Sequence, residues 1–105
     1  ALVGMNTVIM DDAEIGDESI IGAMAFVKAE SIIPNRSLVV GNPAKVIKEV
    51  TDEMIDWKTK GTKLYQQLPK ECHESLKEVE PLRKVPEKLE IQDVFYKTLR
   101  NFIKE

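Results

Sequence analysis

The chain has 105 residues, of which 43% are hydrophobic, and its 15 basic and 18 acidic residues give a formal charge of −3. This length fits one small domain, and the lack of a basic excess argues against nucleic acid as a partner. No apolar run reaches the roughly 20 residues of a membrane span, and no signal-peptide pattern is present. A single cysteine excludes an internal disulfide. A cytoplasmic location is therefore the default expectation.

Residues 3–44 divide into seven consecutive hexads whose columns match. The first column is aliphatic throughout and the fifth is small throughout: Val3, Ile9, Ile15, Ile21, Val27, Ile33 and Val39, then Thr7, Ala13, Ser19, Ala25, Ser31, Ser37 and Pro43. Neither a helix nor an isolated strand repeats every six residues. The period predicts a triangular β-solenoid in which each hexad forms one strand and one corner, and three hexads close a coil of 18 residues. An ordinary β-sandwich with accidental spacing is the alternative.

The second column contains Gly4, Gly16 and Gly22, where a positive φ or a close backbone approach would favour glycine. Seven hexads make about two and a third coils, whereas stacked repeats normally need about three or more. The first coil would also expose a β edge. We therefore expect the chain to be the C-terminal part of a longer solenoid, or a solenoid completed by other chains.

The solenoid is expected to occupy residues 1–50. Pro43 cannot donate a ladder hydrogen bond and restricts Asn42 to extended geometry, so it predicts the end of the coils. One more apolar stretch is then predicted to cover the last coil, formed by Val46, Ile47 and Val50.

Residues 51–81 are predicted to form a helical cap. Thr51 is the expected N-cap of a first helix, which ends at Gly61 in the C′ position. Thr62 begins a second helix, in which Pro69 predicts a kink or a break. Trp57 and Tyr65 are interpreted as packing anchors.

Residues 82–88 resemble a linker, and residues 89–105 are predicted to form a terminal amphipathic helix. The apolar spacing of this last segment suits docking on the solenoid or on a neighbouring subunit. The spacing comes from Ile91, Val94, Phe95, Leu99, Phe102 and Ile103.

Several segments together resemble the gamma-class carbonic-anhydrase-like hexapeptide-repeat family, in the branch encoded with carnitine metabolism and phenylacetate degradation. They are residues 2–6, 8–11, 25–29, 38–45, 57–66 and 78–82. The resemblance covers residues 1–85, and the helical tail is its most specific part. It implies a left-handed parallel β-helix, followed by C-terminal α-helices and assembled as a homotrimer. It also implies zinc held by three histidines between subunits.

Family relatives are described as carbonic anhydrases, CoA thioesterases or acyltransferase-like proteins. The resemblance thus implies a trimeric zinc-dependent hydratase or hydrolase acting on CO2, bicarbonate or a small acyl-CoA ester. The alternatives are a hexapeptide acyltransferase-like protein and a non-catalytic trimerising scaffold.

The histidine motif of the family, H-x4-H-G-C, belongs just before the position of Ala1. We therefore expect no metal ligand and no complete catalytic site in this chain alone. Its only histidine, His73, follows Cys72. Both are interpreted as surface or packing residues, because sequence neighbours on a helix point about 100° apart and do not face each other.

The family spacing and the 18-residue coil together suggest three pocket-lining residues. Asn6 would lie one coil above a zinc-binding histidine, and Met24 one coil further; Asp11 would lie one coil above the second histidine. Asn6 would then hydrogen-bond a zinc-bound water or bicarbonate, and Met24 would form a pocket wall. Alternatively, Asn6 is a corner residue with left-handed backbone, Met24 packs, and Asp11 is solvated.

The segment Asn42-Pro43-Ala44-Lys45 is similar to the end of CoA-dependent hexapeptide transferases. This similarity implies that Asn42, Lys45 and Lys48 contact CoA, with the lysines as point charges facing phosphates. The alternative is a chain exit with solvated lysines.

Overall fold

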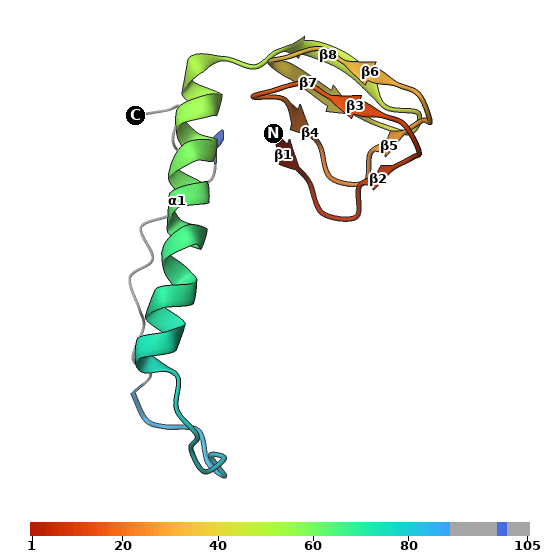
Figure 1. Cartoon of the computed structure of the whole chain (residues 1–105). Helices are drawn as coiled ribbons and strands as arrows, with labels where there is room; N and C mark the ends of the chain where they lie inside the picture. Colours follow the sequence, from red (N-terminus) through yellow and green to blue (C-terminus); the bar gives the residue numbers. More distant parts are fainter. Residues whose placement is uncertain (89–98, 101–105) are drawn as a thin grey trace. The chain divides into compact units, whose positions relative to one another are not determined.

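A computed structural model describes residues 1–88 and 99–100 of the chain (Figure 1). It divides into two compact units, Ala1–Lys58 and Thr59–Glu105, which are considered separately. The helix predicted over residues 89–105 lies outside the described residues except for positions 99–100.

The first unit is a coil of short strands. Every parallel strand pair joins residues 18 apart, for example Val3 with Ile21 and Ile21 with Val39. The 18-residue, three-sided coil predicted from the hexads is therefore confirmed. The strands are β1 Leu2–Val3, β2 Val8–Ile9, β3 Glu14–Ile15, β4 Ile20–Ile21, β5 Phe26–Val27, β6 Ile32–Ile33, β7 Ser37–Val40 and β8 Lys45–Glu49. Parallel pairs join β1 to β4, β4 to β7, β2 to β5 and β3 to β6.

The core lies inside the second coil and is built from the aliphatic and small columns. Its cluster consists of Ile21, Ala25, Val27, Ile33 and Val39. The small column also buries hydroxyls with satisfied hydrogen bonds: the Ser19 hydroxyl donates to the Pro34 carbonyl at 2.8 Å and accepts from the Ser37 amide at 3.1 Å. In the first coil, Val3 and Ile9 remain 48% and 39% exposed.

The glycines of the second column are required by close approach. A Cβ on Gly4 would lie 2.4 Å from the Ala23 amide nitrogen, and one on Gly16 would lie 2.4 Å from that of Asn35. Positive φ occurs instead in the fourth column, where none of the residues is glycine. These residues are Asn6, Asp12, Glu18, Met24, Glu30 and Arg36, with φ between 55° and 63°.

The coil stops after β7, as Pro43 predicts. The chain reverses through Gly41, with φ of 96°, and a cis Asn42-Pro43 bond. Strand β8 then pairs antiparallel with β7 and completes a sheet in the order β1-β4-β7-β8. The predicted apolar cover is confirmed only for Val50, which is buried; Val46 and Ile47 are 50% and 57% exposed.

One helix, α1, spans Asp52–Ser75. Its N-cap is Thr51, as predicted, because the Thr51 hydroxyl accepts a hydrogen bond from the Met54 amide at 3.3 Å. The predicted helix end at Gly61, the second start at Thr62 and a break at Pro69 are wrong, because α1 is continuous through all three. Interior glycine costs a helix only about 1 kcal/mol and proline about 3, which flanking turns can outweigh.

Residues 76–88 contain neither helix nor strand. Among the described residues, no helix has the length and apolar character needed to cross a membrane.

Candidate functional site

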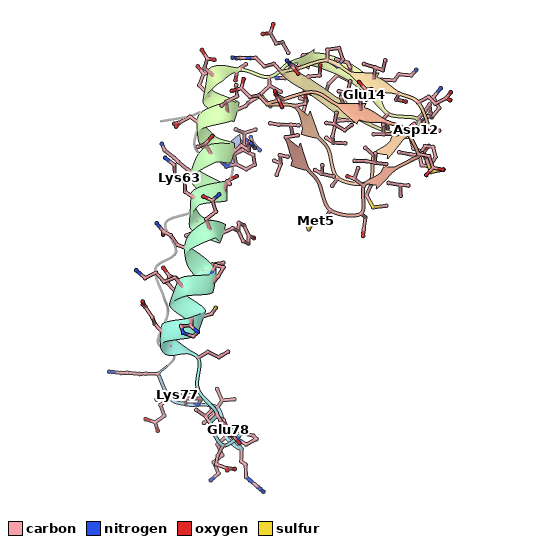
Figure 2. All side chains as sticks on the ribbon, viewed as in Figure 1. Met5, Asp12, Glu14, Lys63, Lys77 and Glu78 are labelled. Atoms are coloured by element: carbon pink, nitrogen blue, oxygen red, sulfur yellow. The ribbon has the colours of Figure 1, made fainter. Side chains whose placement is uncertain are left out.

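Asn6 and Met24 occupy equivalent corners, one coil apart, after β1 and β4. The Met24 amide donates to the Met5 carbonyl at 2.9 Å, which stacks the two corners directly. Both residues have left-handed backbone, which asparagine tolerates and methionine rarely adopts. Met24 is 67% exposed and Met5, labelled in Figure 2, is 82% exposed. The same left-handed backbone recurs at the corners of Asp12, Glu18, Glu30 and Arg36, so it is a property of the coil and not of Met24 alone.

Asp11 lies at a different corner, the one that follows β2. Its carbonyl accepts the Glu30 amide at 2.9 Å, so its backbone joins this corner to the coil above. The Asp11 side chain is exposed. The structure therefore brings Asn6 and Met24 together and separates Asp11 from them.

The two lysines proposed to meet CoA lie on β8. Lys48 pairs with Leu38 and Lys45 pairs with Val40, and an irregularity in the ladder lies between them. Leu38 and Val40 both alternate with the fully buried Val39, so they point away from the core. Paired residues on adjacent strands share a face.

Lys45 and Lys48 therefore lie on the outer face of the same sheet. A regular strand would put residues three apart on opposite faces. The extra residue in β8 changes the alternation, and the sequence alone gives no signal of it. Asn42 precedes them in the turn, where neighbouring backbone groups bond to β5: Gly41 accepts the Phe26 amide at 2.9 Å and Ala44 donates to the Phe26 carbonyl at 2.8 Å.

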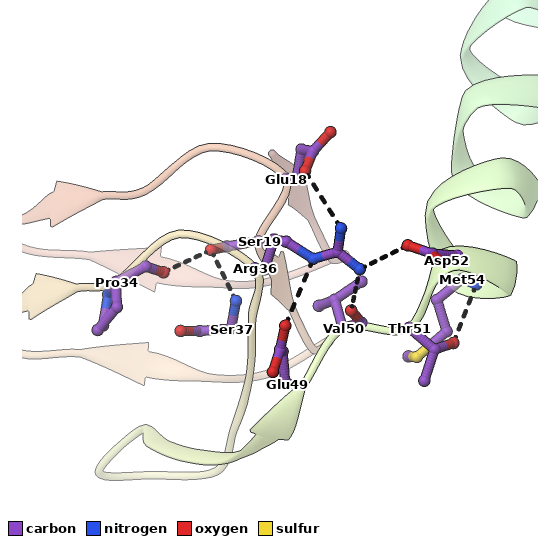
Figure 3. Close-up of polar contacts among 10 residues, drawn as sticks. All are labelled: Glu18, Ser19, Pro34, Arg36, Ser37, Glu49, Val50, Thr51, Asp52 and Met54. Carbon is purple, nitrogen blue, oxygen red and sulfur yellow. Dashed lines mark hydrogen bonds and ion pairs between the residues drawn. The ribbon is translucent and has the colours of Figure 1, made fainter.

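A further polar cluster surrounds Arg36 at the corner after β6 (Figure 3). One guanidinium nitrogen, Nη2, lies 2.7 Å from Asp52 Oδ1 and 3.0 Å from the Val50 carbonyl. Glu49 and Glu18 lie at 3.7 and 4.0 Å from Nε and Nη1. The hydrogen bond to Asp52 raises the pKa of Arg36 above its ordinary value. Arg36 therefore stays charged over the ordinary pH range.

Sequence analysis missed this cluster, because its members come from residues 18–52 and meet only through the coil.

The cysteine, the histidine and the two aromatic residues singled out from the sequence lie on α1. Cys72 and His73 are exposed, in line with a surface role. Tyr65 is 72% exposed, so its interpretation as a packing anchor is wrong; Trp57 is half-buried. Across residues 1–88 and 99–100, no group of three or more histidine, cysteine, aspartate or glutamate side chains is placed to hold a metal ion. These residues therefore do not fit a zinc site.

Solved structures with the same coil support the class of fold. A hexapeptide transferase family protein from Anaplasma phagocytophilum matches 66% of this chain and 42% of its own, with 29% identity and a TM-score of 0.62. A Bacillus cereus protein provisionally assigned as an acetyltransferase matches 71% of this chain and 43% of its own, with 38% identity and a TM-score of 0.58. The chain is a hexapeptide-repeat protein with a left-handed parallel β-helix.

Sequence comparison identifies more specific relatives of the chain. The chain is a homologue of the carnitine operon protein CaiE: it is 52% identical to that of Escherichia coli K12 and 53% identical to that of Salmonella agona, in each case over 87 residues. These residues are 83% of this chain and 44% of each relative, so the chain spans less than half of their length. No protein-family model matches the chain.

Proposed function

We propose that this chain supplies the closing coils and tail helix of a hexapeptide-repeat enzyme that acts on a CoA ester, as an acyltransferase or thioesterase. The observation that carries the proposal is the likeness to the B. cereus acetyltransferase-type protein, at 38% identity and a TM-score of 0.58. Homology to a protein named for the carnitine operon agrees with small-acyl chemistry.

The arrangement at the chain exit supports a role in holding CoA. Lys45 and Lys48 share the outer face of one sheet, and both are exposed. Two ammonium groups on one face suit the several phosphates of CoA, as flexible point charges. Asn42 lies in the turn before them and adds an amide that donates and accepts hydrogen bonds.

The stacked corner offers a different contribution. Met24 supplies a flexible apolar side chain of the kind that adapts to an acyl group, and Asn6 supplies a polar amide one coil away. In this proposal the corner contacts the acyl end of the ester, and Asp11 remains a solvated corner residue. A homotrimer would bring such a corner against a neighbouring copy.

Isothermal titration of the purified chain with acetyl-CoA tests the proposal. Lys45→Ala and Lys48→Ala should each weaken binding by about twofold to tenfold, because each removes one charge facing a phosphate. Lys63→Ala, which removes an exposed lysine from α1, is the matched control and should leave binding unchanged. No detectable binding, or equal weakening by Lys63→Ala, would remove the proposed role of β8.

The second candidate is a zinc-dependent hydratase or hydrolase acting on CO2, bicarbonate or a small ester. Its support is the confirmed 18-residue coil, because with the family's spacing Asn6 would lie one coil above a zinc-binding histidine. Since the described residues do not fit a metal site, the zinc ligands would lie outside them. Zinc analysis together with sedimentation separates the cases: zinc in a trimer favours this candidate. A trimer that holds neither zinc nor acetyl-CoA favours a scaffold.

A further inference from the structure

Arg36 lies where the chain leaves the solenoid, and its backbone is held on both sides. Its amide donates to the Asp17 carbonyl at 2.8 Å, and its carbonyl accepts the Val50 amide at 2.8 Å. Its φ of 55° belongs to the left-handed region that long side chains rarely occupy. The base of the side chain therefore has a fixed position, and only the guanidinium can move.

On the helix side, one nitrogen of the guanidinium is bonded to the start of α1. Nη2 donates to the Val50 carbonyl and to Asp52, the first residue of the helix. The neighbouring Thr51 caps the Met54 amide and accepts the Ile55 amide through its carbonyl at 3.1 Å. The bond to Asp52 thus holds the first turn of α1 to the last corner of the coil.

On the solenoid side, two carboxylates lie within ion-pair distance of the guanidinium but form no hydrogen bond with it. Glu49 lies 3.7 Å from Nε and Glu18 lies 4.0 Å from Nη1. Nε itself is shielded from solvent and has no hydrogen-bond partner. A buried donor without a partner is costly, and a small rotation toward Glu49 would satisfy it. One cation therefore faces three anions and makes a short contact with only one.

We propose that Arg36 is a salt-sensitive latch whose guanidinium exchanges between Asp52 on the helix and Glu18 with Glu49 on the solenoid. In the structure it is closed on Asp52. Exchange to the other two carboxylates frees the first turn of α1 while the coil stays intact. The Asp52 side chain is 90% exposed, against 78% for Glu49 and 52% for Glu18, so ions screen the bond to Asp52 most strongly and favour release at high salt.

Amide hydrogen exchange at Met54 and Ile55, compared with the Phe26 amide inside the coil, tests the latch. Raising salt from about 0.01 M to about 1 M shortens the screening length from about 30 Å to about 3 Å. This should speed exchange at Met54 and Ile55 by about twofold to fivefold and leave Phe26 unchanged. Asp52→Asn should produce the same acceleration at low salt and remove the salt dependence.

The matched control is Glu53→Gln, which removes a carboxylate from the same helical turn without touching Arg36. It should retain the salt dependence. The decisive variant is Glu18→Gln with Glu49→Gln, because losing the competing acceptors should slow exchange at Met54 and Ile55. Faster exchange in this double variant would mean that all three carboxylates anchor Arg36 together, and the latch would be wrong. A salt-independent wild type would overturn it as well.

Discussion

At the scale of single residues, the coil depends on positions where a side chain has no room. A Cβ on Gly16 would lie 2.4 Å from the Asn35 amide nitrogen of the next coil, whereas the nearest atom to a Cβ on Gly22 would be a Val40 side-chain carbon at 2.9 Å, with the Val39 carbonyl oxygen further away at 3.4 Å. Backbone cannot move aside without separating the coils, but a side chain can change its rotamer. The two glycines occupy the same column of the hexad and yet differ in what surrounds them.

Gly16→Ala should therefore destabilise the chain more than Gly22→Ala. We expect a loss of about 1–3 kcal/mol for Gly16→Ala, because the added methyl group overpacks against backbone, and a smaller loss for Gly22→Ala. Urea unfolding of the two variants measures the difference. Equal losses, or a larger loss for Gly22→Ala, would mean that the coils are not packed as described.

The residues of the candidate site differ in how far sequence could locate them. The stacking of Asn6 and Met24 follows directly from a period of six and a coil of three hexads. The shared face of Lys45 and Lys48 depends on a local bulge, and the Arg36 cluster depends on contacts between residues 13 to 18 positions apart. The six-residue period contains no signal for the bulge or for the Arg36 cluster, so neither was predicted.

At the scale of elements, the strands followed their pattern more closely than the helix did. Each two-residue strand begins and ends where the column of aliphatic residues requires, since those side chains must enter a narrow interior. Helix ends have no comparable constraint. Gly61 and Pro69 have strong local preferences, but α1 continues through them, because a helix that has already formed loses little by including one poor residue.

Gly61→Ala should therefore strengthen α1. If Gly61 lies inside a continuous helix, alanine should add about 0.5–1 kcal/mol of stability by reducing the entropy lost on folding. Circular dichroism at 222 nm during thermal unfolding reports the change. A drop in helical signal would instead support the helix end predicted at Gly61 from sequence.

At the scale of the whole molecule, the repeat determines the fold because seven successive hexads carry the same pattern of aliphatic and small side chains. The sequence period was sufficient to predict the coil and its three sides, and Pro43 predicted where the coil ends. The period did not predict that β8 reverses direction. Val46 and Ile47 are apolar and yet lie exposed on this strand. The candidate binding residues could be assigned only to corners of the coil and to one face of β8. The described residues do not form an enclosed pocket lined by catalytic groups.

The 18-residue coil underlies the fold, the stacked corner and the proposed CoA face, and disulfide trapping tests it directly. Val8 and Phe26 are paired across β2 and β5, and they alternate with the inward Ile9 and Val27. Their Cα atoms should be about 4.8 Å apart, within the range of a disulfide. In a Cys72→Ser background, Val8→Cys with Phe26→Cys should oxidise within one chain, and mass mapping should identify that bond. Val8→Cys with Ile32→Cys should not, and efficient cross-linking of this second pair in place of the first would contradict the coil.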